Sequence, residues 1–165
     1  MTHQRILIAG IGNIFLGDDA FGVEVAQRLA TRRLPEGVRV VDYGIRGFDL
    51  AYALLDDYDA TIMVDATQRG GDPGTLYVIE PELDELSELG APSIETHGMD
   101  PVKVLQFAKT LGGQPRRLLV VGCEPATLES EDGRMGLSTP VQSAVDEALN
   151  LIESLVERIY TTTVT

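Results

Sequence analysis

The strongest constraint on the fold of this 165-residue chain is an alternation of short apolar runs with helix-like patterns. Apolar runs of strand length, rich in β-branched residues, occupy Arg5–Ala9, Val38–Asp42 and Ala60–Asp65. Between them, Asp19–Arg33 and Gly47–Leu55 carry apolar residues at helical spacing. Buried parallel strands are typically continuous apolar runs joined by crossover helices. The alternation therefore predicts an α/β fold, a three-layer sandwich with helices on both faces of one sheet.

One further strand is predicted to be antiparallel to the others. A strong turn at Gly70–Gly74 is followed at once by the apolar run Thr75–Ile79. Parallel neighbours need a connection of about a dozen residues or more. The connection from Ala60–Asp65 is too short for a crossover helix, so we expect Thr75–Ile79 to be antiparallel.

The remaining elements complete a single domain over residues 1–165. Asp100 and Pro101 are typical of a helix start, and Gly112 ends the helix that they open. A fifth strand is predicted at Leu118–Val121, and an apolar stripe from Val141 to Val156 predicts a long final helix.

The composition excludes two classes of partner. Acidic residues number 26 against 13 basic ones, which gives a net charge of −13. Nucleic acids and anionic membranes attract cationic surfaces, so neither is expected as a partner. No apolar run approaches the roughly 18 residues of a membrane span. The lone Cys123 excludes an internal disulfide, and we expect a cytoplasmic monomer.

The negative charge is concentrated in one segment. Residues 42–95 contain thirteen acidic side chains and only two basic ones, Arg46 and Arg69. This segment is expected to attract a cation or a basic partner, and association driven by its charge would slow at high salt. Ordinary solubility is the alternative explanation.

The first loop does not match a nucleotide site. Gly10–Gly12 follows the first strand, but Phe15 stands where a dinucleotide-binding motif needs a third glycine. Asp18 and Asp19 occupy the positions of the lysine and hydroxyl residue of a phosphate-binding loop. Two carboxylates would repel a phosphate.

Four polar residues are candidates for chemistry. In α/β sheets, ligands bind beyond the carboxyl ends of the strands, where the strand order reverses. Asp19, Asp42 and Asp65 follow or close predicted strands, and His97 lies just before a predicted helix. One of the adjacent Asp18 and Asp19 is expected to cap the first helix, which leaves the other for a cation.

Each candidate has a simpler explanation. Asp65 could bond to loop amides or pair with Arg69, and a lone histidine is more often a surface residue than a ligand. Cys123 is expected to be a small buried hydrophobe whose pKa neighbouring acids raise, and Glu124 to lie in a solvated turn.

The motifs together resemble one family. In chain order they are Gly10-x-Gly12-Asn13-(x)4-Asp18-Asp19-x-x-Gly22, Asp42-x-Gly44-x-x-Gly47, Val64-Asp65-Ala66, Thr96-His97 and Gly122-x-x-Pro125. This series resembles the hydrogenase maturation endopeptidases, which trim the C-terminal extension from the nickel-containing large subunit of nickel–iron hydrogenases. The resemblance covers nearly the whole chain. It implies a twisted five-stranded mixed sheet whose fourth strand is antiparallel.

The resemblance also implies a site and a substrate. Its metal ligands fall on Asp19, Asp65 and His97, and the nickel that they recognise is supplied by the substrate precursor. Other divalent metals are a second candidate in vitro. Members of the family cut after a basic residue near the metal centre of the precursor.

The sequence is compatible with more than one chemical step and with more than one function. We hypothesise that water attacks a metal-polarised carbonyl with Asp42 or another carboxylate of the cleft as general base, although the metal could serve recognition alone. Two other functions fit the same residues: a nickel-sensing chaperone or docking factor without protease activity, and a different hydrolase on the same fold.

Overall fold

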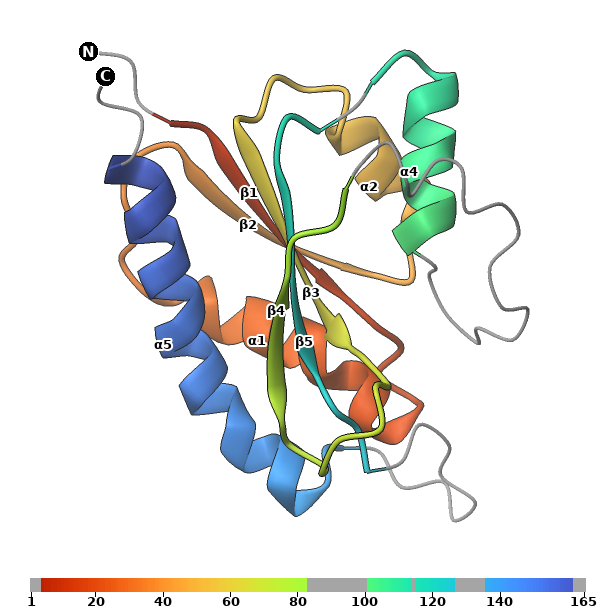
Figure 1. Ribbon diagram of the computed structural model, residues 1–165, viewed down its shortest axis with the longest axis vertical. Coiled ribbons are helices and arrows are strands. Elements are labelled where there is room, and N and C mark those ends of the chain that lie inside the picture. The colour runs from red at the N-terminus through yellow and green to blue at the C-terminus, as the bar shows by residue number, and fades with distance from the viewer. Residues whose placement is uncertain (1–3, 83–100, 114, 127–135, 162–165) are drawn as a thin grey trace.

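The protein is described by a computed structural model over residues 4–82, 101–113, 115–126 and 136–161 (Figure 1). One sheet contains the strands β1 (Ile6–Ile11), β2 (Val38–Gly44), β3 (Ala60–Ala66), β4 (Leu76–Ile79) and β5 (Leu118–Cys123). Their order in the sheet is β2-β1-β3-β5-β4. β4 is antiparallel to β5, whereas the other neighbouring pairs are parallel. The predicted direction of the fourth strand is confirmed.

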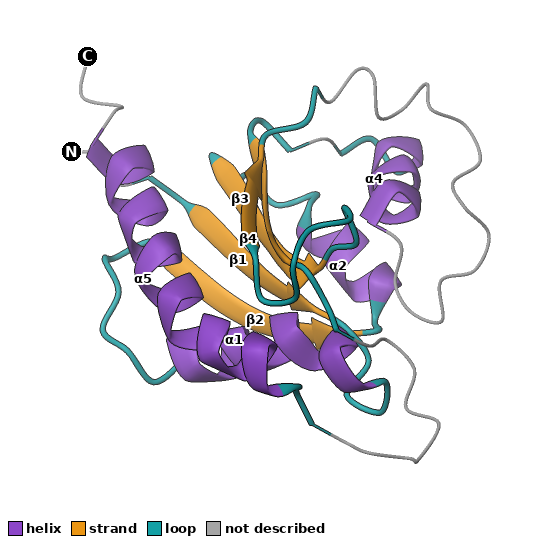
Figure 2. Ribbon diagram, turned by 60° about the horizontal axis from the view of Figure 1, so that its bottom comes forward, coloured by secondary structure: helices purple, strands orange, loops and turns teal. Residues whose placement is uncertain are grey.

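Helices cover both faces of the sheet, as Figure 2 shows. They are α1 (Phe21–Leu29), α2 (Gly47–Ala53), α4 (Pro101–Thr110) and α5 (Thr139–Thr161), and a 3₁₀ turn, η1 (Gly17–Ala20), precedes α1. α1 and α5 pack on one face and α2 and α4 on the other, each with its own apolar cluster. The predicted three-layer α/β sandwich is confirmed. Within the described residues, no helix is long and apolar enough to cross a membrane.

The first helix is shorter than the sequence predicts. The prediction covered Asp19–Arg33, but α1 begins at Phe21 and ends at Leu29. Leu29 is the last buried apolar residue of the helix, and residues 30–33 are exposed. Helices in proteins are stabilised mainly by a buried apolar face. Because no apolar residue from 30 to 33 is buried, α1 ends at Leu29.

Two glycines bring α1 against the sheet. A Cβ atom on Gly10 of β1 would collide with the carbonyl oxygen of Gly22 in α1, and one on Gly22 would collide with the carbonyl oxygen of Val64 in β3. The helix backbone therefore lies directly over β1 and β3. This close packing explains two glycines of the first motif and fixes the loop that joins β1 to α1.

Candidate functional site

The strand order reverses beside β1. The chain runs from β1 to β2 on one side and then crosses to β3 on the other side of β1. In such sheets the crevice at this switch point is the usual ligand site. The loop after β1 carries Asp19, and β3 carries Asp65 near its carboxyl end.

Asp19 lies in η1 and is partly buried. Its Oδ2 accepts a hydrogen bond of 2.8 Å from the backbone N–H of Asn13. The backbone at Gly12 has a φ of 147°, and a Cβ there would collide with the carbonyl oxygen of Asp19. Burial raises the pKa of Asp19, and the Asn13 N–H lowers that pKa by less. The ionised carboxylate is thus partly desolvated, which favours a bound cation.

Asp65 faces the opposite side of the sheet from α1. Side chains alternate along a strand, and Val64 packs in the cluster under α1 and α5, whereas Met63 packs under α2 and α4. Asp65 is therefore directed to the α2 and α4 side. It is half-buried, and its Oδ1 accepts a hydrogen bond of 2.8 Å from the N–H of Ala66.

His97, the third predicted ligand, lies outside the described residues, four positions before the start of α4. Among the residues that the structure does describe, no three His, Cys, Asp or Glu side chains gather closely enough to hold a metal. Asp19 and Asp65 therefore supply two candidate ligands, and the assignment of His97 stays a prediction.

Asp18 has a structural role that the sequence did not predict. Its side chain is fully buried, and it accepts hydrogen bonds from the N–H of Ala126 (2.8 Å), the N–H of Ser138 (2.7 Å) and the hydroxyl of Ser138 (2.8 Å). The N-cap residue of α1 is Ala20, and both Asp18 and Asp19 lie before it in η1, so the expectation that one of them caps the first helix is wrong. Asp18 instead ties the first loop to the segments after β5 and before α5.

Glu124 is also buried rather than solvated, with 5% of its surface exposed. Its Oε1 accepts hydrogen bonds from the hydroxyl of Tyr77 (2.7 Å) and from the N–H groups of Arg69 and Gly71 (2.9 Å each). These donors, Tyr77 first, hold the pKa of Glu124 below its ordinary value. The carboxylate fixes the loop after β3, and no local sequence pattern reveals donors so far away.

Cys123 is a buried thiol, as predicted. Burial first, and then the charges of Asp18 and Glu124, raise the pKa of Cys123 to about 12. A thiol with this pKa carries almost no thiolate at neutral pH, and the thiolate is the nucleophile.

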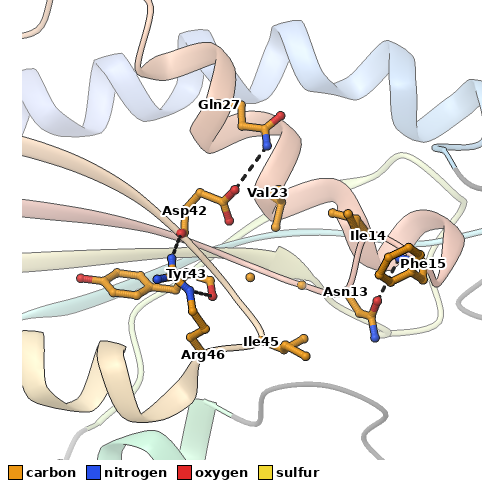
Figure 3. Close-up of a pocket in the computed structure, with 11 residues that line it drawn as sticks. Asn13, Ile14, Phe15, Val23, Gln27, Asp42, Tyr43, Ile45 and Arg46 are labelled. Carbon is orange, nitrogen blue, oxygen red and sulfur yellow. Dashed lines mark hydrogen bonds between the residues drawn. The ribbon is translucent and has the colours of Figure 1, made fainter.

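Asp42 lines a pocket of about 370 Å³ between the loop after β1 and the loop after β2 (Figure 3). Tyr43 packs under α2 and α4, so Asp42 is directed to the α1 side, where its Oδ2 accepts a 3.3 Å hydrogen bond from Gln27. The structure therefore brings Asp42 beside the first loop but not onto the face that carries Asp65.

Comparisons with known proteins point to one family. The family model described as hydrogenase maturation protease matches residues 23–155. The chain is 36% identical to a putative hydrogenase maturation protease of Methanocaldococcus jannaschii, over 92% of this chain and 96% of that protein. It is 33% identical to the hydrogenase 2 maturation protease of Escherichia coli, over 90% of this chain and 88% of that protein.

Solved structures give the same result. The hydrogenase maturating endopeptidase HybD of Escherichia coli superposes with a TM-score of 0.79 at 30% identity, covering 94% of this chain and 93% of HybD. The hydrogenase maturation protease HycI of Thermococcus kodakarensis has a TM-score of 0.68 at 28% identity, with 94% of each chain covered. The similarity therefore covers the fold over almost the whole chain.

Proposed function

Because the chain belongs to the hydrogenase maturation protease family, we propose that it is an endopeptidase that removes the C-terminal extension of a nickel–iron hydrogenase large-subunit precursor after nickel insertion. The nickel ion is part of the substrate in this proposal. Asp19, Asp65 and His97 contact that ion, so that cleavage depends on whether the precursor has been loaded.

The observation that carries the proposal is the position of two carboxylates at the switch point. β1 and β3 are parallel neighbours, and Gly10 pairs with Val64, so Asp65 follows directly beside the end of β1. Adjacent strands lie about 4.8 Å apart. Carboxylate and imidazole groups suit a divalent transition metal. The raised pKa of Asp19 also fits, because a cation would offset the burial of its charge.

Hydrolysis by water is the chemistry that fits best. Cys123 is the only cysteine, and a pKa of about 12 makes it a poor nucleophile. The nickel ion of the substrate would polarise the scissile carbonyl, and Asp19 and Asp65 would hold the metal centre in place.

The predicted general base, Asp42, lies apart from these ligands. β1 separates β2 from β3, so Asp42 and Asp65 are two strand spacings apart, roughly 10 Å, and they face opposite sides of the sheet. This placement favours contact with the substrate away from the metal rather than proton transfer beside it.

One experiment tests the proposal. Purified protein is incubated with a large-subunit precursor, with and without nickel, and the products are weighed by mass spectrometry. Nickel-dependent loss of a C-terminal peptide is the expected result. A stable complex without cleavage would support the chaperone instead, and neither complex nor cleavage would point to a different hydrolase.

The same assay tests the ligands. Asp19→Ala, Asp65→Ala and His97→Ala are each expected to lose cleavage, whereas Asp56→Asn, at an exposed carboxylate after α2, serves as the matched control. Normal cleavage by all three alanine variants would remove the metal site from the proposal.

A further inference from the structure

Arg69 carries a charge that the proposed function does not use. The segment that concentrates the negative charge has one other basic residue, Arg46, whose guanidinium donates to two backbone carbonyl oxygens and to the carboxylate of Asp49. Arg69 is exposed, and among the residues that the structure describes no carboxylate, Asp65 included, forms an ion pair with it. The charge of Arg69 is therefore available to a ligand.

The position of Arg69 is fixed by Glu124 and Tyr77. The backbone N–H groups of Arg69 and Gly71 donate to Glu124 Oε1, and the same oxygen accepts the hydroxyl of Tyr77. The guanidinium carbon of Arg69 lies 5.7 Å from the centre of the Tyr77 ring. The face of an aromatic ring attracts a cation but does not neutralise it. The guanidinium is thus oriented by the ring while it keeps its charge.

The Tyr77 ring lies on the same face of the sheet as Asp65. Both residues are opposite Gly122 in the strand register, and residues opposite one another on neighbouring strands share a face. Leu76, the neighbour of Tyr77, packs against the apolar cluster under α1 and α5, so Tyr77 is directed to the α2 and α4 side. Asp65 and Tyr77 are two strand spacings apart, roughly 10 Å. The guanidinium beside the ring is therefore close to the candidate metal site.

Thr67 occupies the space between Asp65 and the ring that orients Arg69. A Cβ on Gly122 of β5 would collide with the hydroxyl of Thr67, so this side chain lies directly over Gly122. Figure 1 shows the loop between β3 and β4, which carries Thr67 and Arg69, beside the end of β5. A row of polar side chains, Asp65, Thr67 and Arg69, therefore crosses the end of β5.

This row has the length and the chemistry to bind an extended peptide. An extended chain rises about 3.3 Å per residue, so roughly 10 Å corresponds to about three residues. In the proposed function the metal centre of the precursor lies at Asp65. A peptide that continues from there across β5 brings a residue about three positions further on to Arg69. A guanidinium binds a carboxylate through two parallel hydrogen bonds, which are stronger than bonds between neutral groups.

We propose that Arg69 binds an acidic side chain of the precursor, about three residues from the part of the peptide that lies at Asp65. Tyr77 orients the guanidinium, and Glu124 holds both residues through its hydrogen bonds. The inference rests on the proposed function. It adds a contact for an anion to a site whose other candidate ligands bind a cation.

The test uses nickel-loaded precursors in which each residue two to four positions from the cleaved bond, on either side, is in turn glutamate, glutamine or lysine. At one of these positions the wild type is expected to prefer glutamate over glutamine by about 3- to 10-fold in kcat/KM, chiefly through KM. Arg69→Gln should lose this preference by raising KM for the glutamate precursor. Arg69→Glu should instead prefer the lysine precursor.

Two matched variants separate the charge of Arg69 from effects on folding. Arg69→Lys keeps the charge but not the two parallel donors, and it should keep part of the preference. Arg33→Gln, which removes an exposed arginine after α1, should keep the wild-type preference. Because exposed ion pairs are screened, the preference of the wild type should also shrink at high salt. Circular dichroism checks that each variant is folded.

The possible failures can be told apart. If the wild type cleaves no precursor, the proposed function is wrong. If it cleaves the glutamate, glutamine and lysine precursors equally at every position, the function stands and the Arg69 contact is wrong. If Arg69→Gln lowers kcat on every precursor to the same extent, Arg69 acts at the reacting bond and the contact is again overturned. Loss of the preference in Arg33→Gln would assign it to the overall charge and would overturn the contact as well.

Discussion

Asp18 and Asp19 are neighbours in the chain but differ in almost every physical respect. Asp18 is fully buried, and its carboxylate accepts three hydrogen bonds from residues more than 100 positions away. Asp19 is partly exposed, accepts a bond from the nearby Asn13, and has a pKa raised by burial. The fold stabilises the Asp18 carboxylate through hydrogen bonds. The ionised Asp19 carboxylate instead carries a desolvation penalty, which a bound cation could offset.

The same contrast separates Glu124 from Asp65. Glu124 follows β5, is nearly inaccessible, and collects donors from the loop after β3 and from Tyr77. Asp65 lies on the adjacent strand β3, is half-buried and faces the side from which α4 begins. The edge of the sheet thus has an inner pair of carboxylates, Asp18 and Glu124, that holds loops together. It also has an outer pair, Asp19 and Asp65, that is only partly buried and to which the proposed function assigns the metal contact.

The largest expected effect is a loss of cleavage activity without a loss of stability, and it distinguishes the outer pair from the inner pair. Asp65→Asn should slow cleavage of nickel-loaded precursor by about 100-fold or more, because a metal contact is lost. Its urea unfolding midpoint should stay close to that of the wild type. Single-turnover cleavage and urea unfolding measure the two effects. Equal losses of activity and stability would place Asp65 in the inner pair.

The next effect is on folding. Asp18→Ala should lower the free energy of unfolding by about 3 kcal/mol, because the buried donors of Ala126 and Ser138 lose their acceptor. Urea unfolding followed by circular dichroism measures this change, with Asp56→Ala as the exposed control. A loss of less than about 1 kcal/mol would mean that water replaces the carboxylate.

A smaller effect depends on pH. Glu124→Gln should lower the melting temperature at pH 7 by about 3 °C, because the charged acceptor of the Tyr77 hydroxyl is lost. The folded-state pKa of Glu124 lies below its ordinary value of 4.5, so the stabilisation is present above pH 4.5 and disappears as the pH falls through the folded pKa. Melting curves from pH 7 to pH 3 should therefore converge. Parallel curves would contradict the role of the charge.

The smallest effect has the opposite sign. Asp19→Asn should raise the melting temperature at pH 7 by about 1–2 °C, because it removes a partly desolvated charge and keeps an acceptor for Asn13. The folded pKa of Asp19 lies above 3.8, so wild-type stability falls as the pH rises through it, and the gain should vanish below pH 3.8. Cleavage should be lost in the same variant. A lower melting temperature at pH 7 would make Asp19 a structural residue.

Much of the fold could be predicted because its signals are local. β1, β2, β3 and β5 are apolar runs, and the direction of β4 follows from a connection too short for a crossover. The rule that ligands bind at the switch point predicts that Asp19 and Asp65 lie at one edge of the sheet, and the strand order agrees with it.

The partners of the inner pair could not be predicted, since they are distant in sequence. Asp18 bonds to Ala126 and Ser138, which are more than 100 positions away in the chain. Glu124 bonds to the amides of a loop that precedes it by more than 50 residues. Adjacent aspartates look alike in a sequence, and only the packing shows which one is enclosed.

The hydrogen bonds of Asp18 have a mechanical consequence. They join the loop after β1 to the start of α5, so neither segment can shift without carrying the other or breaking charge-assisted bonds. Asp19 is therefore mounted on a stiff frame rather than on a hinge. Because the site is rigid, a precursor binds well only if its surface is already complementary to it. A misfolded or incompletely assembled precursor therefore gains little binding free energy.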